Sequence, residues 1–102
     1  MSIPVAGFYF ISGYAQWTTV DGTGVRGLAL SSGAVSAAVP GGTIFDMNTA
    51  PGSGNARAKV SASCSTMVYL GASSQVYASI FQSSGNTLTV APVILSAIWM
   101  TS

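Results

Sequence analysis

The stretch from Gly7 to Trp17 constrains the fold more than any other, because it is aromatic, uncharged and apolar at both alternating sets of positions. Aromatic residues favour a β-strand, and side chains on a strand point alternately to its two faces. One face carries Phe8, Phe10 and Tyr14, and the other carries Tyr9, Ile11, Ala15 and Trp17. An antiparallel sheet in a small domain usually buries only one face. We therefore expect this strand to need two covers, one from a second sheet and one from a neighbouring subunit.

The composition is that of a folded chain of one domain with few charged residues. Its 102 residues are 49% hydrophobic and 5% charged, which excludes a disordered segment. The longest apolar candidate, Ala91–Met100, is too short to span a membrane, which takes about 20 apolar residues. The start, Met1 to Pro4, lacks the basic and apolar regions of a secretory leader. We expect a soluble protein made in a cytoplasm, without a signal peptide and without a membrane partner.

The low charge of the chain limits the kinds of partner that it can bind. Three basic and two acidic side chains give a formal net charge of +1, too little for the basic patch that binds nucleic acid. Low charge also removes the usual protection of a surface against association. We infer that other protein covers much of the surface.

The chemistry of catalysis is missing from the sequence. There is no histidine, so neither a Ser-His nor a Cys-His pair can form. Asp21 and Asp46 are the only side-chain carboxylates, and each lies in a sequence context typical of a turn. Cys64 is the only cysteine, which excludes an intrachain disulfide and favours a small buried residue over a reactive thiol. We expect no enzyme, no cofactor and no metal site.

Short strands separated by Gly, Ser, Asn and Pro predict an all-β sandwich, with no helix and no internal repeat. The first strand and a second at Val25–Ser31 are expected to form a hairpin through a loop at Thr18–Gly24. Asn48–Asn55 is the clearest predicted loop. The other predicted strands are Ala34–Val39, Thr43–Met47, Ala56–Leu70, Gln75–Gln82, Thr87–Val90 and Val93–Thr101. We divide the chain into a lead-in or arm at residues 1–6 and a sandwich domain at residues 7–102.

Four segments carry a family resemblance. They are Gly7-Phe8-Tyr9-Phe10-Ile11, Gly24-Val25-Arg26 with the strand after it, Val68-Tyr69-Leu70-Gly71-Ala72, and Leu95-Ser96-Ala97-Ile98-Trp99. Their order resembles the C1q/TNF-like jelly roll, particularly that of bacteriophage structural proteins. The resemblance implies a short antiparallel jelly-roll sandwich that assembles as a homotrimer with an apolar axis. Ser73-Ser74 stands where that family has an acidic residue, so no calcium site is expected, and the family's usual first strand is absent.

The trimer or partner interface is predicted from the apolar strands and from the one arginine inside such a strand. The candidates are Tyr9, Ile11, Trp17, Arg26, Tyr77, Trp99 and Met100. Arg57 and Lys59 lie two residues apart on one face of their predicted strand. They are either a solvated edge that discourages aggregation or a contact for an acidic partner, and the sequence leaves both open.

Two functions fit these expectations. The first is a virion structural protein, a homotrimeric capsid decoration (cement) protein that binds the major capsid protein across capsomer joints. The second is a receptor-binding tip or accessory of a phage tail fibre or spike, which contacts a host glycan or protein through loops such as Thr18–Gly24 and Asn48–Asn55. A tip normally belongs to a longer chain with a shaft, and this sequence starts at its own Met1, so the decoration protein is the preferred hypothesis.

Overall fold

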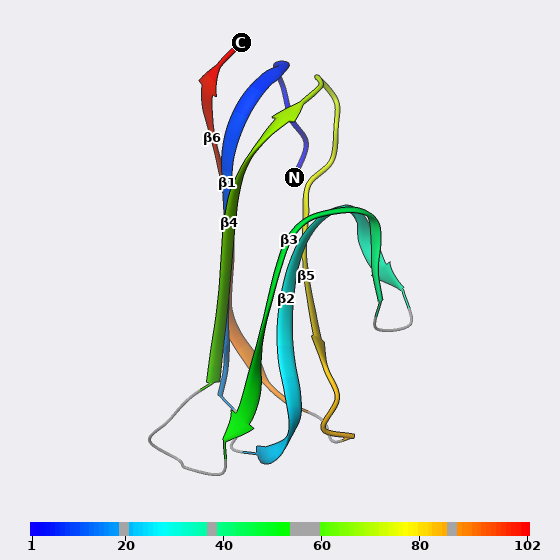
Figure 1. The fold of residues 1–102 in the computed structure, drawn as a ribbon, viewed down its shortest axis with the longest axis vertical. Helices are drawn as coiled ribbons and strands as arrows, with labels where there is room; N and C mark the ends of the chain where they lie inside the picture. Colours follow the sequence, from blue (N-terminus) through cyan, green and yellow to red (C-terminus); the bar gives the residue numbers. More distant parts are fainter. Residues whose placement is uncertain (19–20, 37–38, 54–59, 86–87) are drawn as a thin grey trace.

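The computed structural model describes residues 1–18, 21–36, 39–53, 60–85 and 88–102, and these form two antiparallel sheets of three strands each. The strands are β1 (Gly7–Trp17), β2 (Asp21–Ser36), β3 (Val39–Ser53), β4 (Val60–Leu70), β5 (Tyr77–Gln82) and β6 (Val90–Thr101). One sheet has the order β4-β1-β6 and the other has the order β3-β2-β5. Figure 1 shows them as two layers, with the strands along the 45 Å long axis of the molecule. The all-β prediction is confirmed.

None of the described residues is helical, so this part of the chain holds no helix that could cross a membrane.

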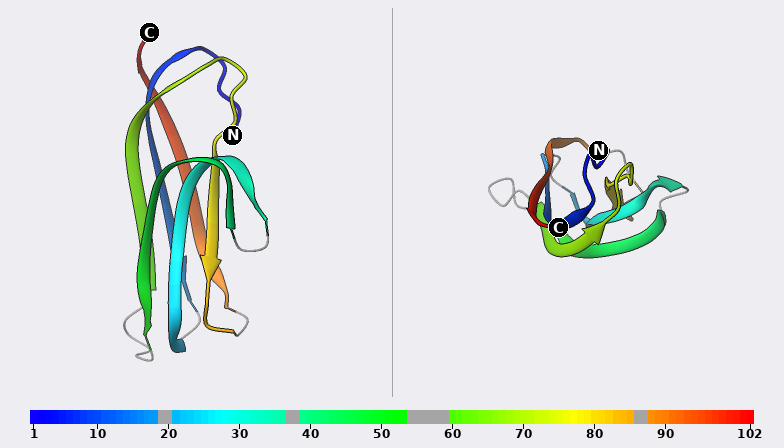
Figure 2. Two further views of the ribbon diagram at one scale, coloured as in Figure 1. Left: turned by 45° about the vertical axis from the view of Figure 1, so that its right-hand side comes forward. Right: turned by 90° about the horizontal axis from the view of Figure 1, so that it is seen from above.

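The strand predicted at Gly7–Trp17 is confirmed and is the central strand of its sheet. It pairs with β4 on one side, from Gly7 opposite Leu70 to Trp17 opposite Val60, and with β6 on the other. The predicted hairpin between β1 and β2 is wrong. Both edges of β1 are taken by strands from far along the sequence, and β2 lies in the opposite sheet (Figure 2).

Strands β2 and β3 form one long hairpin, in which the predicted strand at Ala34–Val39 is divided between the two arms. The loop predicted at Asn48–Asn55 is wrong for residues 48–53, which belong to β3; residues 54 and 55 lie outside the described residues. β3 is an edge strand of its sheet, and an edge tolerates Pro51, which has no N–H to donate. Register shifts between Leu30 and Ser36 accompany the bend of the hairpin tip past β5 (Figure 1).

The remaining predictions are close to the observed strands. β4 covers the described part of the predicted strand Ala56–Leu70, and β5 begins two residues later than predicted. The last strand runs through Pro92, because β6 begins at Val90.

The core lies between the sheets and includes residues from both. Its buried members are Ile3, Tyr9, Ile11, Ala15, Trp17, Leu28, Leu30, Ala62, Cys64, Leu70 and Val76. A Cβ atom added to Gly13 would lie 2.9 Å from Cδ2 of Leu30. The absence of a side chain at Gly13 therefore lets the centres of the two sheets approach closely.

The residues before β1 continue the sandwich at its upper end. Backbone hydrogen bonds join Ile3 to Ser73 and Ser74, and Met1 to Val76. The Tyr9 hydroxyl donates to the carbonyl of Val5 over 2.5 Å. The segment before β1 is thus held against the chain that leads into β5.

Candidate interaction surface

The face of β1 that the sequence analysis assigned to a partner is buried in the core, and the opposite face is exposed. Tyr9, Ile11 and Trp17 point into the core, and each is less than 5% exposed. Phe8 and Phe10 point away from the second sheet and are 42% and 40% exposed. The alternation was predicted correctly, but the face assigned to a partner is the one that the chain itself covers.

The outer face of the β4-β1-β6 sheet carries an apolar patch that the described part of the chain does not cover. Phe10 lies opposite Met67 on β4 and Ile98 on β6. The rings of Phe8 and Tyr69 meet edge to face, with centroids 5.3 Å apart and planes at 74°. We call this surface the outer patch; its members, 40–59% exposed, are Phe8, Phe10, Met67, Tyr69, Ile94, Ile98 and Met100.

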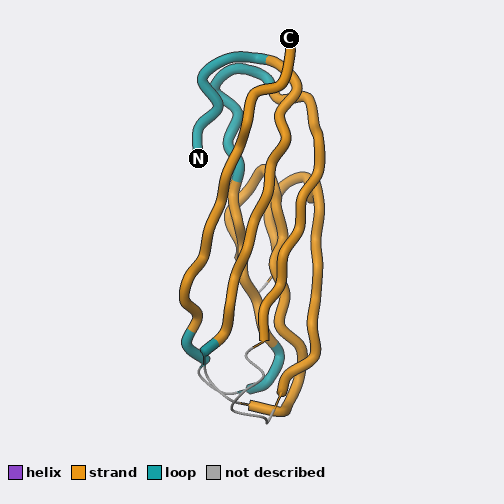
Figure 3. Tube along the Cα trace, turned by 90° about the vertical axis from the view of Figure 1, so that its left-hand side faces the viewer, coloured by secondary structure: helices purple, strands orange, loops and turns teal. Residues whose placement is uncertain are grey.

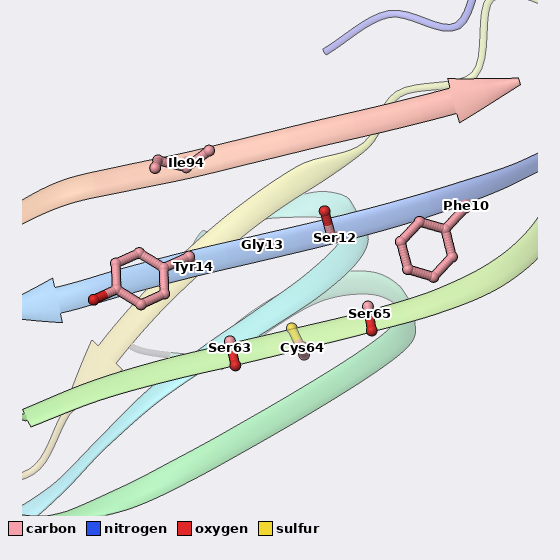
Figure 4. A pocket seen from close by; sticks show the side chains of 8 residues that line it. All are labelled: Phe10, Ser12, Gly13, Tyr14, Ser63, Cys64, Ser65 and Ile94. Atoms are coloured by element: carbon pink, nitrogen blue, oxygen red, sulfur yellow. The ribbon is translucent and has the colours of Figure 1, made fainter.

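A belt of hydroxyl groups crosses the same face below the phenylalanines. Ser12 on β1 lies opposite Ser65 on one side and Ser96 on the other, and the Oγ atoms of Ser12 and Ser96 are 2.6 Å apart, within hydrogen-bonding distance. A hollow of about 340 Å³ lies over this belt. Figure 4 shows Phe10, Tyr14 and Ile94 around a floor of Ser12, Gly13, Ser63, Cys64 and Ser65. None of these residues is charged.

A second hollow, of about 490 Å³, lies beside β6 at the upper end. It is lined by the segment from Met1 to Val5 and by Tyr9, Ala97 and Trp99. Trp99 is 49% exposed, although it belongs to the face of β6 that continues the core side of β1. The core side of β6 is thus only partly covered by the second sheet.

The other predicted interface residues also differ in their exposure. Arg26 is fully buried, on the same alternating set of β2 as Leu28 and Leu30, so it offers no surface to a partner. Tyr77 is half-buried, and Met100 is exposed as a member of the outer patch. Arg57 and Lys59 lie outside the described residues.

The sequence analysis missed most of the outer patch. The signal was present in the small polar residues that share its alternation. Ser12 and Gln16 follow Phe8 and Phe10 on β1, and Ser61, Ser63 and Ser65 precede Met67 and Tyr69 on β4. Serine and glutamine are rarely fully buried, so the face that carries them is the outer one.

Side chains of β3 hydrogen-bond to backbone groups at the edge of β4 that does not pair with β1. The Nδ2 atom of Asn48 donates to the carbonyl of Ser63 over 2.9 Å, and the amide of Ser65 donates to Oδ2 of Asp46 over 2.9 Å. Asp46 lies in β3, within the strand predicted at Thr43–Met47, although its sequence context is also typical of a turn. Its carboxylate joins the two sheets along this edge.

Cys64 is a buried free thiol that faces the second sheet, and its sulfur lies 3.9 Å from the carbonyl oxygen of Leu28. Burial, and then the negative charge of Asp46, raise the pKa of Cys64 to about 11. At neutral pH the group is a protonated thiol, which is neither a nucleophile nor a metal ligand.

No group of three or more His, Cys, Asp or Glu side chains that could hold a metal ion occurs among the described residues. Comparison of the chain with protein-family models, with curated proteins and with solved structures finds no match. The C1q/TNF-like resemblance stays a prediction from the sequence motifs.

Proposed function

We propose that this chain is a non-enzymatic structural protein of a bacteriophage virion, a homotrimeric decoration protein that binds the major capsid protein across capsomer joints. The observation that carries the proposal is the outer patch. Seven large apolar side chains are between 40% and 59% exposed on one sheet face, and none of the strand residues of that face is charged. Exposed apolar patches of this kind mark protein interaction sites.

Burial of the outer patch would favour assembly through the hydrophobic effect. Each 1,000 Å² of apolar surface removed from water contributes on the order of 25 kcal/mol before the costs of association are subtracted. A protein that holds a shell together needs buried surface and no reaction. An uncharged outer patch suits that role better than transient, electrostatically steered binding, which depends on charged surfaces.

The order of strand pairing supports a jelly roll. The first strand pairs with the last, β2 pairs with β5, and β3 lies next to β4 along one edge of the sandwich. Such nested pairing is how a jelly roll is wound from a long hairpin. Together with the motifs at Gly7–Ile11 and Leu95–Trp99, it supports the threefold arrangement that the resemblance implies, with the outer patch toward the axis.

The test is to count the copies of the chain in virions and to locate them by labelling and electron microscopy. We expect hundreds of copies on the head. Met67→Lys, which places a charge in the outer patch, should lower the occupancy of the head, whereas Ser61→Lys on the same strand and face should not. A few copies at the end of the tail, or none in the particle, would contradict the decoration role.

The hollow over the serine belt favours a second candidate, the receptor-binding tip of a tail fibre or spike. Aromatic rings beside hydroxyl groups, without charge, are suited to a neutral glycan, since rings stack on sugar faces and hydroxyls bond to sugar hydroxyls. Titration with neutral oligosaccharides, followed by NMR, tests this candidate. Shifts confined to the hollow and abolished by Tyr14→Ala would support it, and no shifts at millimolar sugar would exclude it.

A further inference from the structure

The two edges of the β4-β1-β6 sheet differ in what lies beside them. The edge strand β4 is closed by Asp46 and Asn48 of β3. In the described part of the chain no strand pairs with the outer side of β6. β5, the strand of the second sheet nearest to β6, makes much less contact with it than β3 makes with β4. Figure 3 views the molecule from the side on which the β4-β1-β6 sheet lies. β6 therefore presents a row of backbone N–H and C=O groups to the surroundings.

The exposed edge is long, regular and uncharged. Between the register shifts at its two ends, Val93 to Trp99 pair one for one with Ala15 to Tyr9. The side chains of this segment are large and apolar on both faces, with Val93, Ile94, Ile98 and Trp99 between 45% and 57% exposed. Natural edge strands are usually blunted by charge, proline or a bulge. In β6, Pro92 and the register shifts lie at the ends of this segment, and none of the three interrupts it between Val93 and Trp99.

We propose that β6 pairs antiparallel with β6 of a second copy of this chain, about a twofold axis at Ser96, to form a continuous six-stranded sheet. Ser96 is the midpoint of the regular segment. In this register Ile94 lies opposite Ile98 of the partner, and Val93 lies opposite the partner's Trp99 on the other face. Leu95 lies opposite the partner's Ala97, so a large side chain lies opposite a small one there.

The observations favour a second copy over a foreign strand. The segment is self-complementary about its own centre, which a twofold axis requires. It carries no charge that would repel its copy across the axis. Pairing would also satisfy the open backbone groups and cover Val93 and Trp99, which the second sheet leaves exposed.

The inference goes beyond the proposed function and does not depend on it. The outer patch lies on the face of the sheet, whereas the new contact extends the sheet sideways at its edge. A threefold contact through the face and a twofold contact through the edge would link subunits of different trimers.

The first experiment is disulfide trapping in a Cys64→Ala background. Residues directly opposite in an antiparallel pair have Cα atoms about 4.5–5.5 Å apart, within disulfide range. Oxidation of Ser96→Cys should therefore give a covalent dimer. Ile94→Cys and Ile98→Cys should not cross-link alone, because each lies about 13 Å from its own copy, but a mixture of the two should. Self-cross-linking of Ile94→Cys, or no product from Ser96→Cys and from the mixture, would overturn the proposal.

The second experiment separates this contact from the threefold one by sedimentation velocity. Val93→Lys places a charge opposite the partner's Trp99 and should weaken the pairing of subunits about tenfold or more, while leaving any trimer intact. Met67→Lys should do the reverse. If Val93→Lys leaves the particle size unchanged, the edge contact is wrong. If only Met67→Lys leaves it unchanged, the threefold arrangement of the proposed function fails and the edge contact stands.

Discussion

The two faces of the β4-β1-β6 sheet both carry large apolar side chains but lie in different surroundings. On one face Tyr9, Ile11 and Trp17 are covered by the second sheet of the same chain. On the other, Phe8 and Phe10 stand open, with the serine belt below them. The apolar residues alone thus do not distinguish the two faces of the sheet. The serines distinguish them, because in this sheet they lie only on the face that the second sheet of the same chain does not cover.

A matched pair of substitutions tests this difference between the faces most strongly. Ile11→Ala removes a fully buried side chain, and Ile98→Ala removes one that is 57% exposed on the neighbouring strand. We expect Ile11→Ala to lower the free energy of unfolding by about 2–5 kcal/mol. Ile98→Ala should change that of the isolated subunit by less than about 1 kcal/mol. Denaturant unfolding at low protein concentration measures both, and equal losses would mean that the faces are not distinct.

Gly13 and Ser63 give a second matched pair. A side chain at Gly13 would meet Leu28 and Leu30 of the opposite sheet, so Gly13→Val should destabilise the fold by about 1–3 kcal/mol through overpacking. Ser63→Val, on the exposed outer face of the adjacent strand, should have little effect. Thermal unfolding compares the two, and a neutral Gly13→Val would show that the sheets are not in close contact there.

The burial of Cys64 on the covered face predicts how the stability of the fold depends on pH. Its pKa is raised to about 11 in the folded chain, from a value of 9.0, so the unfolded chain loses its thiol proton first as the pH rises. The stability due to this shift is complete below about pH 9 and is lost toward pH 11. We expect a loss of about 1–2 kcal/mol, less than the full shift implies because Cys64 keeps some exposure to solvent, which screens the interaction. Unfolding at about pH 8 and pH 11 should show this loss in the wild type and not in Cys64→Ala; equal losses would contradict the burial of the thiol.

The smallest expected effect concerns the closed edge of β4. Asp46→Ala removes the acceptor of the Ser65 amide and should cost about 0.5–1.5 kcal/mol. Hydrogen exchange at Ser65 should become faster in Asp46→Ala, while Asp46→Asn, which keeps an oxygen acceptor, should retain most of the protection. Unchanged exchange in Asp46→Ala would show that the carboxylate does not close this edge.

The positions of the strands were largely predictable, because alternation and turn residues are local properties of the sequence. The pairing was not. Thr18–Gly24 has the composition of a hairpin loop, but β1 pairs with β4 on one edge and with β6 on the other. No local pattern in the sequence reveals these long-range pairings. Asn48 to Ser53 have the composition of a loop but lie in β3, because an edge strand tolerates proline. The side chain of Asn48 also hydrogen-bonds to Ser63 of the other sheet.

The sequence of β1 predicted that both of its faces are apolar, but it only partly predicted which residues the chain itself leaves exposed. Trp99 and Met100 are exposed as the interface prediction requires. Tyr9, Ile11 and Arg26 were assigned by their hydrophobicity or by their place in an apolar strand, and all three are buried. Ser12 and Gln16 carried the information that Phe8 and Phe10, and not Tyr9 and Ile11, belong to the open face.

The most direct test of the account is the size of the particle formed by the purified chain at micromolar concentration, for the wild type, Met67→Lys and Ser61→Lys. If the outer patch is a protein interface, the wild type and Ser61→Lys sediment as multiples of three subunits. Met67→Lys should lose that contact while its subunits remain folded. A wild type that stays a stable single subunit, or a Met67→Lys variant of unchanged size, would contradict the central claim that other protein covers this face.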